Sequence, residues 1–97
     1  MVDIERAKEF IKIRDELYKQ GVIGISFFED SIHVLLDVLL DVENIKIEEE
    51  RNNPLIKYPY TVSARIDGIT FFALADDIKL HEFMKKRKER KEKNEIV

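Results

Sequence analysis

The dipeptide Asp67-Gly68 constrains the fold of this 97-residue chain more than any other feature of its sequence. It stands between two runs rich in strand-forming residues, 60–66 and 69–75. Asp-Gly in that setting is the strongest short-range signal for a β-hairpin, because a two-residue type I′ turn requires positive φ at both positions. We therefore predict a hairpin over residues 60–75. It needs a further layer to cover it, because an isolated hairpin is only marginally stable.

The turn also sets the register of the hairpin, since side chains alternate between the two faces of a strand. One face is predicted to be wholly apolar, with the opposed pairs Ile66/Ile69, Ala64/Phe71, Val62/Ala73 and Tyr60/Ala75. The other face is mixed, and on it Phe72 and Leu74 are too apolar for a fully solvated surface. Either another part of the chain covers these two side chains, or they contribute to a contact site.

The remaining elements follow from periodicity and from capping signals. Apolar residues at helical spacing predict a first helix over 4–20, which Asp3 caps and after which Gly21 takes a left-handed conformation. Arg14 lies in the middle of its apolar side. We interpret it as an arginine whose stem packs there while its guanidinium reaches a carboxylate; the alternative is an arginine that binds an anionic ligand or partner. β-Branched and aromatic runs predict strands at 22–28, 31–34 and 45–50. Residues 35–43 fit both a helix and a strand, and we interpret them as a short helix.

Asp76-Asp77 predicts the start of a last helix. Leu80, Phe83 and Met84 share one side of this helix and are expected to pack it against the rest of the domain. The predicted order is α-β-β-α-β-β-β-α, an α+β fold with an antiparallel sheet of about five short strands and helices packed mainly on one face. We assign residues 1–84 to one globular domain. Residues 85–97 are assigned to a basic C-terminal helical extension, whose lysines and glutamates are spaced to pair at i,i+4.

Composition argues against the common catalytic sites. There is no cysteine, which excludes disulfides and thiolate metal sites, and the three glycines form neither a dinucleotide fingerprint nor a phosphate loop. His33 is interpreted as a solvent-facing or hydrogen-bonded histidine, with no recognised metal-ligand spacing around it. We expect no enzymatic activity, no cofactor and no metal. With no apolar run long enough to span a membrane and no signal peptide at the N-terminus, a cytosolic location is expected.

The charge distribution suggests two interaction surfaces. Residues 1–78 carry 9 Lys and Arg against 16 Asp and Glu, a balance of −7, whereas residues 79–97 carry 8 against 4, a balance of +4. The leading hypothesis is a protein-binding module that presents a negative patch to a basic partner, as small inhibitors of nucleic-acid enzymes can do. Its candidate residues are Asp37, Asp41, Glu48, Glu49, Glu50, Phe72 and Leu74.

Two alternatives remain open. The first is a nucleic-acid-associated protein that uses the C-terminal helix, with phosphate contacts from Lys85, Lys86, Arg87, Lys88, Arg90 and Lys91. Glutamates lie among these residues and no aromatic residue does, which favours a solvated, self-paired helix instead. The second is a structural homodimer formed through Phe72 and Leu74 or through the same helix.

The segment Tyr58-Pro59-Tyr60, followed by Asp67-Gly68-Ile69-Thr70-Phe71-Phe72-Ala73-Leu74, resembles small uncharacterised proteins of phages and mobile elements in Gram-positive bacteria. The resemblance covers residues 22–77 and rests on the hairpin pattern. It implies no activity. It implies that a small binding protein directed at a host or a defence system is a reasonable class.

Overall fold

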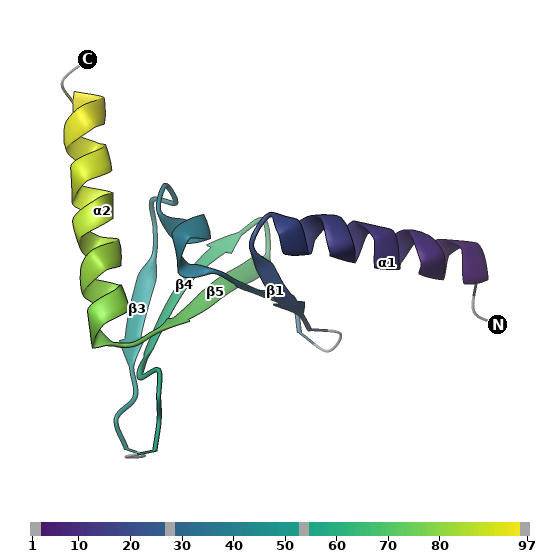
Figure 1. The fold of residues 1–97 in the computed structure, drawn as a ribbon, viewed down its shortest axis with the longest axis horizontal. Coiled ribbons are helices and arrows are strands. Elements are labelled where there is room, and N and C mark those ends of the chain that lie inside the picture. The colour runs from purple at the N-terminus through teal and green to yellow at the C-terminus, as the bar shows by residue number, and fades with distance from the viewer. Residues whose placement is uncertain (1–2, 27–28, 53–54, 96–97) are drawn as a thin grey trace.

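The computed structural model describes residues 3–26, 29–52 and 55–95 (Figure 1). Its elements in chain order are α1 (Ile4–Lys19), β1 (Val22–Ile25), β2 (Ser31–Val34), the 3-10 helix η1 (Leu36–Leu39), β3 (Lys46–Glu49), β4 (Tyr60–Ile66), β5 (Ile69–Ala75) and α2 (Asp77–Glu95). The α+β class and the predicted order of helices and strands are confirmed. The helical interpretation of 35–43 is right, but the helix is only one short 3-10 turn. The predicted strand end at 27–28 lies outside the described residues.

The five strands form one open sheet in the order β1-β2-β5-β4-β3. Neighbouring strands are antiparallel except β2 and β5, which are parallel. The prediction of a wholly antiparallel sheet is therefore corrected to a mixed one. After β2 the chain passes through η1 to the far edge of the sheet, where β3 begins an antiparallel run inward. The third strand of that run, β5, then reaches β2 in the parallel direction.

The hairpin forms as predicted. Asp67 and Gly68 have φ of 51° and 82°, and the register runs from Ile66 opposite Ile69 to Tyr60 opposite Ala75. The middle of the predicted apolar face is buried. Ile66 and Ile69, next to the turn, stay partly exposed, so the covering layer ends before the turn.

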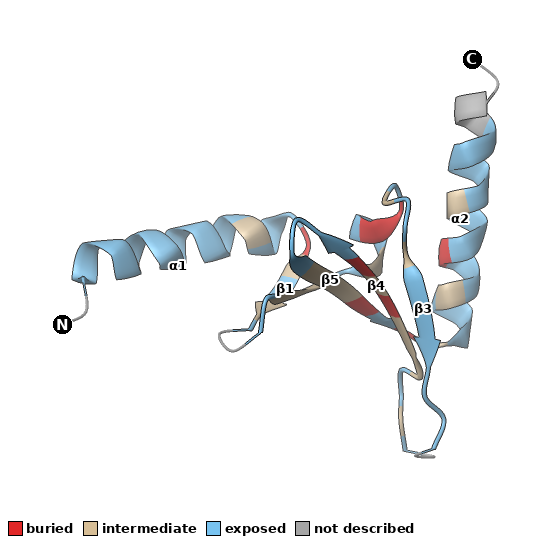
Figure 2. Cartoon of the chain, turned by 180° about the vertical axis from the view of Figure 1, so that it is seen from behind, coloured by how far each residue is buried: buried red, intermediate tan, exposed pale blue. Residues whose placement is uncertain are grey.

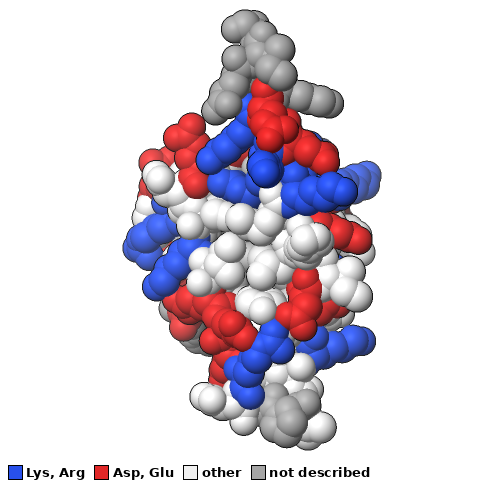
Figure 3. Space-filling model, turned by 90° about the vertical axis from the view of Figure 1, so that its left-hand side faces the viewer, with Lys and Arg blue, Asp and Glu red and all other residues white. Residues whose placement is uncertain are grey.

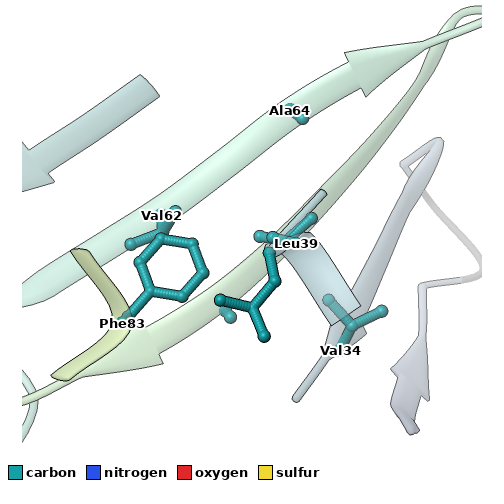
Figure 4. Close-up of a cluster of buried hydrophobic side chains, with 7 residues drawn as sticks. Val34, Leu39, Val62, Ala64 and Phe83 are labelled. Carbon is teal, nitrogen blue, oxygen red and sulfur yellow. The ribbon is translucent and has the colours of Figure 1, made fainter. Parts of the chain in front are cut away.

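That covering layer consists of η1 and the first turns of α2 (Figure 4). Leu39 and Phe83 are its fully buried members, and they pack with Val34 and Val62 of the sheet. The backbone N–H of Lys79 donates to the Asp76 carboxylate at 2.8 Å, which caps the start of α2. Of the three residues predicted to dock α2, Phe83 is buried, Leu80 packs at the edge of the core, and Met84 is largely exposed.

Helix α1 behaves differently from α2. Its N-terminus is capped as predicted, with the Arg6 N–H donating to the Asp3 carboxylate at 3.2 Å, and Gly21 follows it with φ of 102°. However, α1 contains no buried residue, and it projects away from the sheet (Figures 1 and 2). The expectation that both helices pack on the sheet is therefore wrong for α1. The radius of gyration, 16.2 Å, exceeds the roughly 13 Å of a compact domain of about this length.

Candidate partner-binding face of the sheet

One face of the sheet lies under η1 and α2. In the part of the chain that the structure describes, no helix lies over the other face, which we call the open face. The alternation of side chains and the strand register place ten residues on the open face. They are Ser31, His33, Lys46, Glu48, Thr61, Ser63, Arg65, Thr70, Phe72 and Leu74. None of these residues is buried.

The centre of the open face is a stacked pair of rings. The parallel pairing of β2 with β5 sets His33 beside Phe72, with ring centroids 4.7 Å apart and an interplanar angle of 9°. Leu74, two residues further along β5, is 40% exposed. Phe72 is half-buried, and within residues 3–26, 29–52 and 55–95 no helix or further strand lies over Phe72 and Leu74. Of the two explanations that the sequence left open for these residues, a contact site agrees with this geometry.

The surroundings of the stacked rings are polar and predominantly acidic. A shallow depression beside Phe72 is lined by the hydroxyls of Ser31, Thr61, Ser63 and Thr70, and by the charged residues Glu29, Asp30, Glu48 and Arg65. Arg65 donates to the Thr70 hydroxyl at 3.4 Å. At the β3 edge, Lys46 lies 2.7 Å from Glu48, and the hydrogen bond to that carboxylate raises the pKa of Lys46. Three carboxylates against one guanidinium make the lining of the depression negative.

The acidic residues predicted as one patch are divided between different places. Only Glu48 shares the open face with Phe72 and Leu74. Glu49 points to the other face, where it accepts a hydrogen bond from Arg51. Glu50 follows β3 and is exposed, with its backbone N–H donating to the Pro59 carbonyl at 2.8 Å.

Arg51 joins β3, β4 and α2. Besides Glu49, it donates to the Tyr60 hydroxyl at 2.8 Å and to the Asp77 carboxylate at 2.5 Å. The hydrogen bond from Arg51 holds the pKa of Asp77 below its ordinary value, with the Tyr60 hydroxyl adding to the effect. Glu49 and Asp77 thus help to position the start of α2, which is a structural role.

Asp37 and Asp41 lie at η1, on the covered side of the sheet. There they face basic residues of α2, with Lys86 Nζ 3.9 Å from Asp37 and Arg90 hydrogen-bonded to Asp41. These two carboxylates are therefore paired with the chain's own basic helix. They do not join Glu48 in one negative surface.

Half of the basic residues predicted for nucleic-acid contact are engaged with the body in the same way. Arg87 Nη1 donates to the carbonyls of Leu39, Leu40 and Val42 at 3.1, 3.1 and 2.6 Å. Together with Lys86 and Arg90, it ties α2 to η1 and to the turn that follows. Contacts between α2 and the body continue as far as Arg90.

The other three basic residues, Lys85, Lys88 and Lys91, are exposed. Within the described part of the chain, neither Lys85 with Glu89 nor Lys88 with Glu92 forms an ion pair, and the side chain of Lys93 lies outside it. The pairing between α2 and η1 replaces the predicted pairing along the helix. Figure 3 shows Lys and Arg interspersed with Asp and Glu on this side of the molecule, with no continuous basic surface.

Sequence reasoning missed the structural roles of Arg51 and Arg87. For Arg87 a signal existed, because it follows Phe83 by four residues and so lies on the same side of the helix as that docking residue. For Arg51, only Glu49 lies nearby in the sequence; its other two partners, Tyr60 and Asp77, come from later elements.

Among the described residues, no group of three or more His, Asp or Glu side chains is arranged to hold a metal ion. In the same part of the chain, no helix is both long enough and apolar enough to cross a membrane. Comparison with models of known protein families, with curated proteins and with solved structures found no match to this chain.

Proposed function

We propose that this protein is a non-enzymatic protein-binding module that contacts a basic surface of its partner through the open face of the sheet. The observation that carries the proposal is the His33–Phe72 stack, which is partly exposed beside a lining of hydroxyls and carboxylates. Interfaces between proteins are enriched in aromatic residues at their centre and carry polar groups at the rim. An arginine or lysine from a partner fits such a surface, because it can stack on the rings while its charge meets a carboxylate.

The charge of the depression beside Phe72 favours a protein partner over a nucleic acid. Exposed aromatic rings also stack on bases, but that mode of binding needs cationic side chains along the phosphate backbone. Here Glu29, Asp30 and Glu48 surround the depression, and they repel phosphates. The same carboxylates accelerate encounter with a basic protein by electrostatic steering.

A regulator or inhibitor encoded by a phage or mobile element is the biological role that we propose, acting in the cytoplasm of its host. The resemblance of the hairpin to small phage proteins supports this role. So does the acidic lining of the depression, since the enzymes that act on nucleic acids present cationic grooves that an acidic module can occupy.

The test is a capture experiment from a lysate of Gram-positive bacteria, with the immobilised protein and three variants. Glu48→Lys reverses a charge on the open face, and Leu74→Ala removes an exposed apolar side chain from it. Glu89→Lys makes the same charge reversal on α2, on the covered side of the sheet, and serves as the matched control. We expect a protein retained by the wild type and by Glu89→Lys, and retained weakly by both open-face variants. Raising the salt concentration should slow its association with the wild type.

Two results would contradict the proposal. One is a partner captured equally by the wild type and by both open-face variants. The other is a gel shift with nucleic acid that depends on salt and disappears when Lys85, Lys88 and Lys91 are replaced by alanine. That second result would support the nucleic-acid alternative, because these are the basic residues of α2 that the body does not engage.

A further inference from the structure

The exposed side of α1 is the largest feature that the proposed function does not use. Ile4 is 68% exposed, Ile11 44% and Tyr18 71%, although the three lie at seven-residue spacing on one side of the helix. Between this side and β1 runs a largely apolar groove of about 220 Å³, lined by Phe10, Ile11, Arg14 and Tyr18 of α1 and by residues 22–25. A helix with such a stripe ordinarily buries it against another element.

We propose that a second copy of this chain covers the stripe, and that two α1 helices pair antiparallel about a twofold axis at Ile11. In this arrangement Ile11 meets Ile11 of the second copy. Ile4 and Tyr18 lie seven residues to either side of Ile11, so each meets the other across the axis. The stripe is therefore complementary to itself, as a twofold interface requires.

The charges that flank the stripe fit the same arrangement. Twofold antiparallel pairing brings like flanks of the two helices together, and residues whose numbers sum to about 22 or 23 then face each other. On one flank this sets Lys8 against Asp15 of the second copy. The pair forms twice and is attractive. Parallel pairing would instead bring the two Arg14 side chains together in the centre of the stripe.

The groove between α1 and β1 offers a binding site for the N-terminal half of α1 of the second copy. In the antiparallel arrangement, the first half of one α1 runs beside the last half of the other, where the groove lies. Ile4 of the second copy then approaches the groove wall formed by Tyr18 and Val22. Since the axis repeats this contact, both grooves fill and no apolar stripe remains to recruit a third chain. The interface involves the β1 edge, whereas the open face centres on β2, β5 and β4. The inference is therefore independent of the proposed function.

The mass in solution, measured by light scattering during size-exclusion chromatography, tests the pairing. We expect twice the 11.5 kDa of one chain for the wild type. Ile11→Asp should run at the mass of one chain, with an unchanged far-UV circular dichroism spectrum, because Ile11 does not belong to the buried core. Ile13→Asp makes the same change on the opposite side of α1, where Ile13 is 53% exposed, and is the control that should keep the doubled mass. A wild type with the mass of one chain at the highest concentration reached would overturn the proposal, as would an Ile11→Asp variant that stays doubled.

A charge exchange tests the antiparallel register and does not depend on any apolar substitution. Lys8→Glu and Asp15→Lys should each weaken self-association roughly tenfold, because each change turns two attractive contacts into repulsive ones. When the two variants are mixed, the heterodimer regains opposite charges at both contacts. We expect the mixture to associate about as tightly as the wild type. A mixture no tighter than either variant alone would overturn the antiparallel arrangement.

Discussion

Replacement of Arg87 by methionine should destabilise the protein more than any other single change in the basic half of α2. The guanidinium donates to three carbonyls through Nη1, and it donates to the Glu43 carbonyl through Nη2 at 3.3 Å. These carbonyls belong to the end of η1 and to the turn after it. Those of Leu39 and Glu43 also accept a backbone N–H, from Val42 at 3.2 Å and from Ile45 at 2.8 Å, so Arg87 matters most to the carbonyls of Leu40 and Val42. Methionine keeps much of the apolar stem, so the substitution removes chiefly the hydrogen bonds.

The magnitude follows from the number and burial of these bonds. A hydrogen bond to a charged group contributes about 1.5–3 kcal/mol. The bonds here share one nitrogen for the most part and lie partly buried, so water replaces some of them in the variant. We expect a loss of about 2–3 kcal/mol in the free energy of unfolding for the whole set. In a domain of this size, that corresponds to a fall of about 10–20 °C in Tm.

Urea denaturation followed by circular dichroism measures this loss. Arg87→Lys should fall between the wild type and Arg87→Met, because an ammonium group cannot reach four carbonyls in a fork. Lys88→Met, on an exposed neighbour, is the control and should change stability by less than about 0.5 kcal/mol. If Arg87→Met matched that control, the carbonyls would be satisfied without the arginine and the reasoning would be refuted.

Three further outcomes are expected. Gly68→Val should lower the free energy of unfolding by at least about 1–2 kcal/mol, because valine resists positive φ. Beyond the neighbouring residues of the chain, no described atom lies within 4 Å of a Cβ placed there, so backbone strain is the expected cause. An unchanged denaturation midpoint would contradict this. Deletion of residues 88–97 should change stability by less than about 1 kcal/mol, since it removes an exposed ion pair of Arg90 and little apolar surface. Arg51→Met should return the pKa of Asp77 toward its ordinary value of 3.8, followed by NMR of the carboxyl carbon. Because the pKa of Asp77 is depressed in the folded wild type, the ion pair stabilises the fold at pH values above the ordinary pKa of Asp77. This stabilisation is lost as the pH falls through the depressed pKa. The Arg51→Met variant lacks the ion pair, so only the wild type should lose this part of its stability on acidification.

The sequence by itself determined the local structure of this protein. A two-residue turn with positive φ at both positions leaves one register for the strands around it, so Asp67-Gly68 decided which side chains of β4 and β5 share a face. Caps act over a single turn of helix, which is why Asp3 and Asp76 mark the helix starts correctly. Through the register, the sequence also set Phe72 and Leu74 together on one face.

Only the tertiary structure decided how these pieces meet. The parallel pairing of β2 with β5 joins strands separated by almost forty residues, and no local pattern encodes it, although it creates the His33–Phe72 stack. The burial of one side of α2 and the exposure of one side of α1 likewise cannot be read from periodicity, because both helices carry apolar stripes. The division of the acidic residues has the same origin. A charge acquires a partner only when the fold brings another element within a few ångströms, as α2 does for Asp41 while leaving Glu48 on the open face.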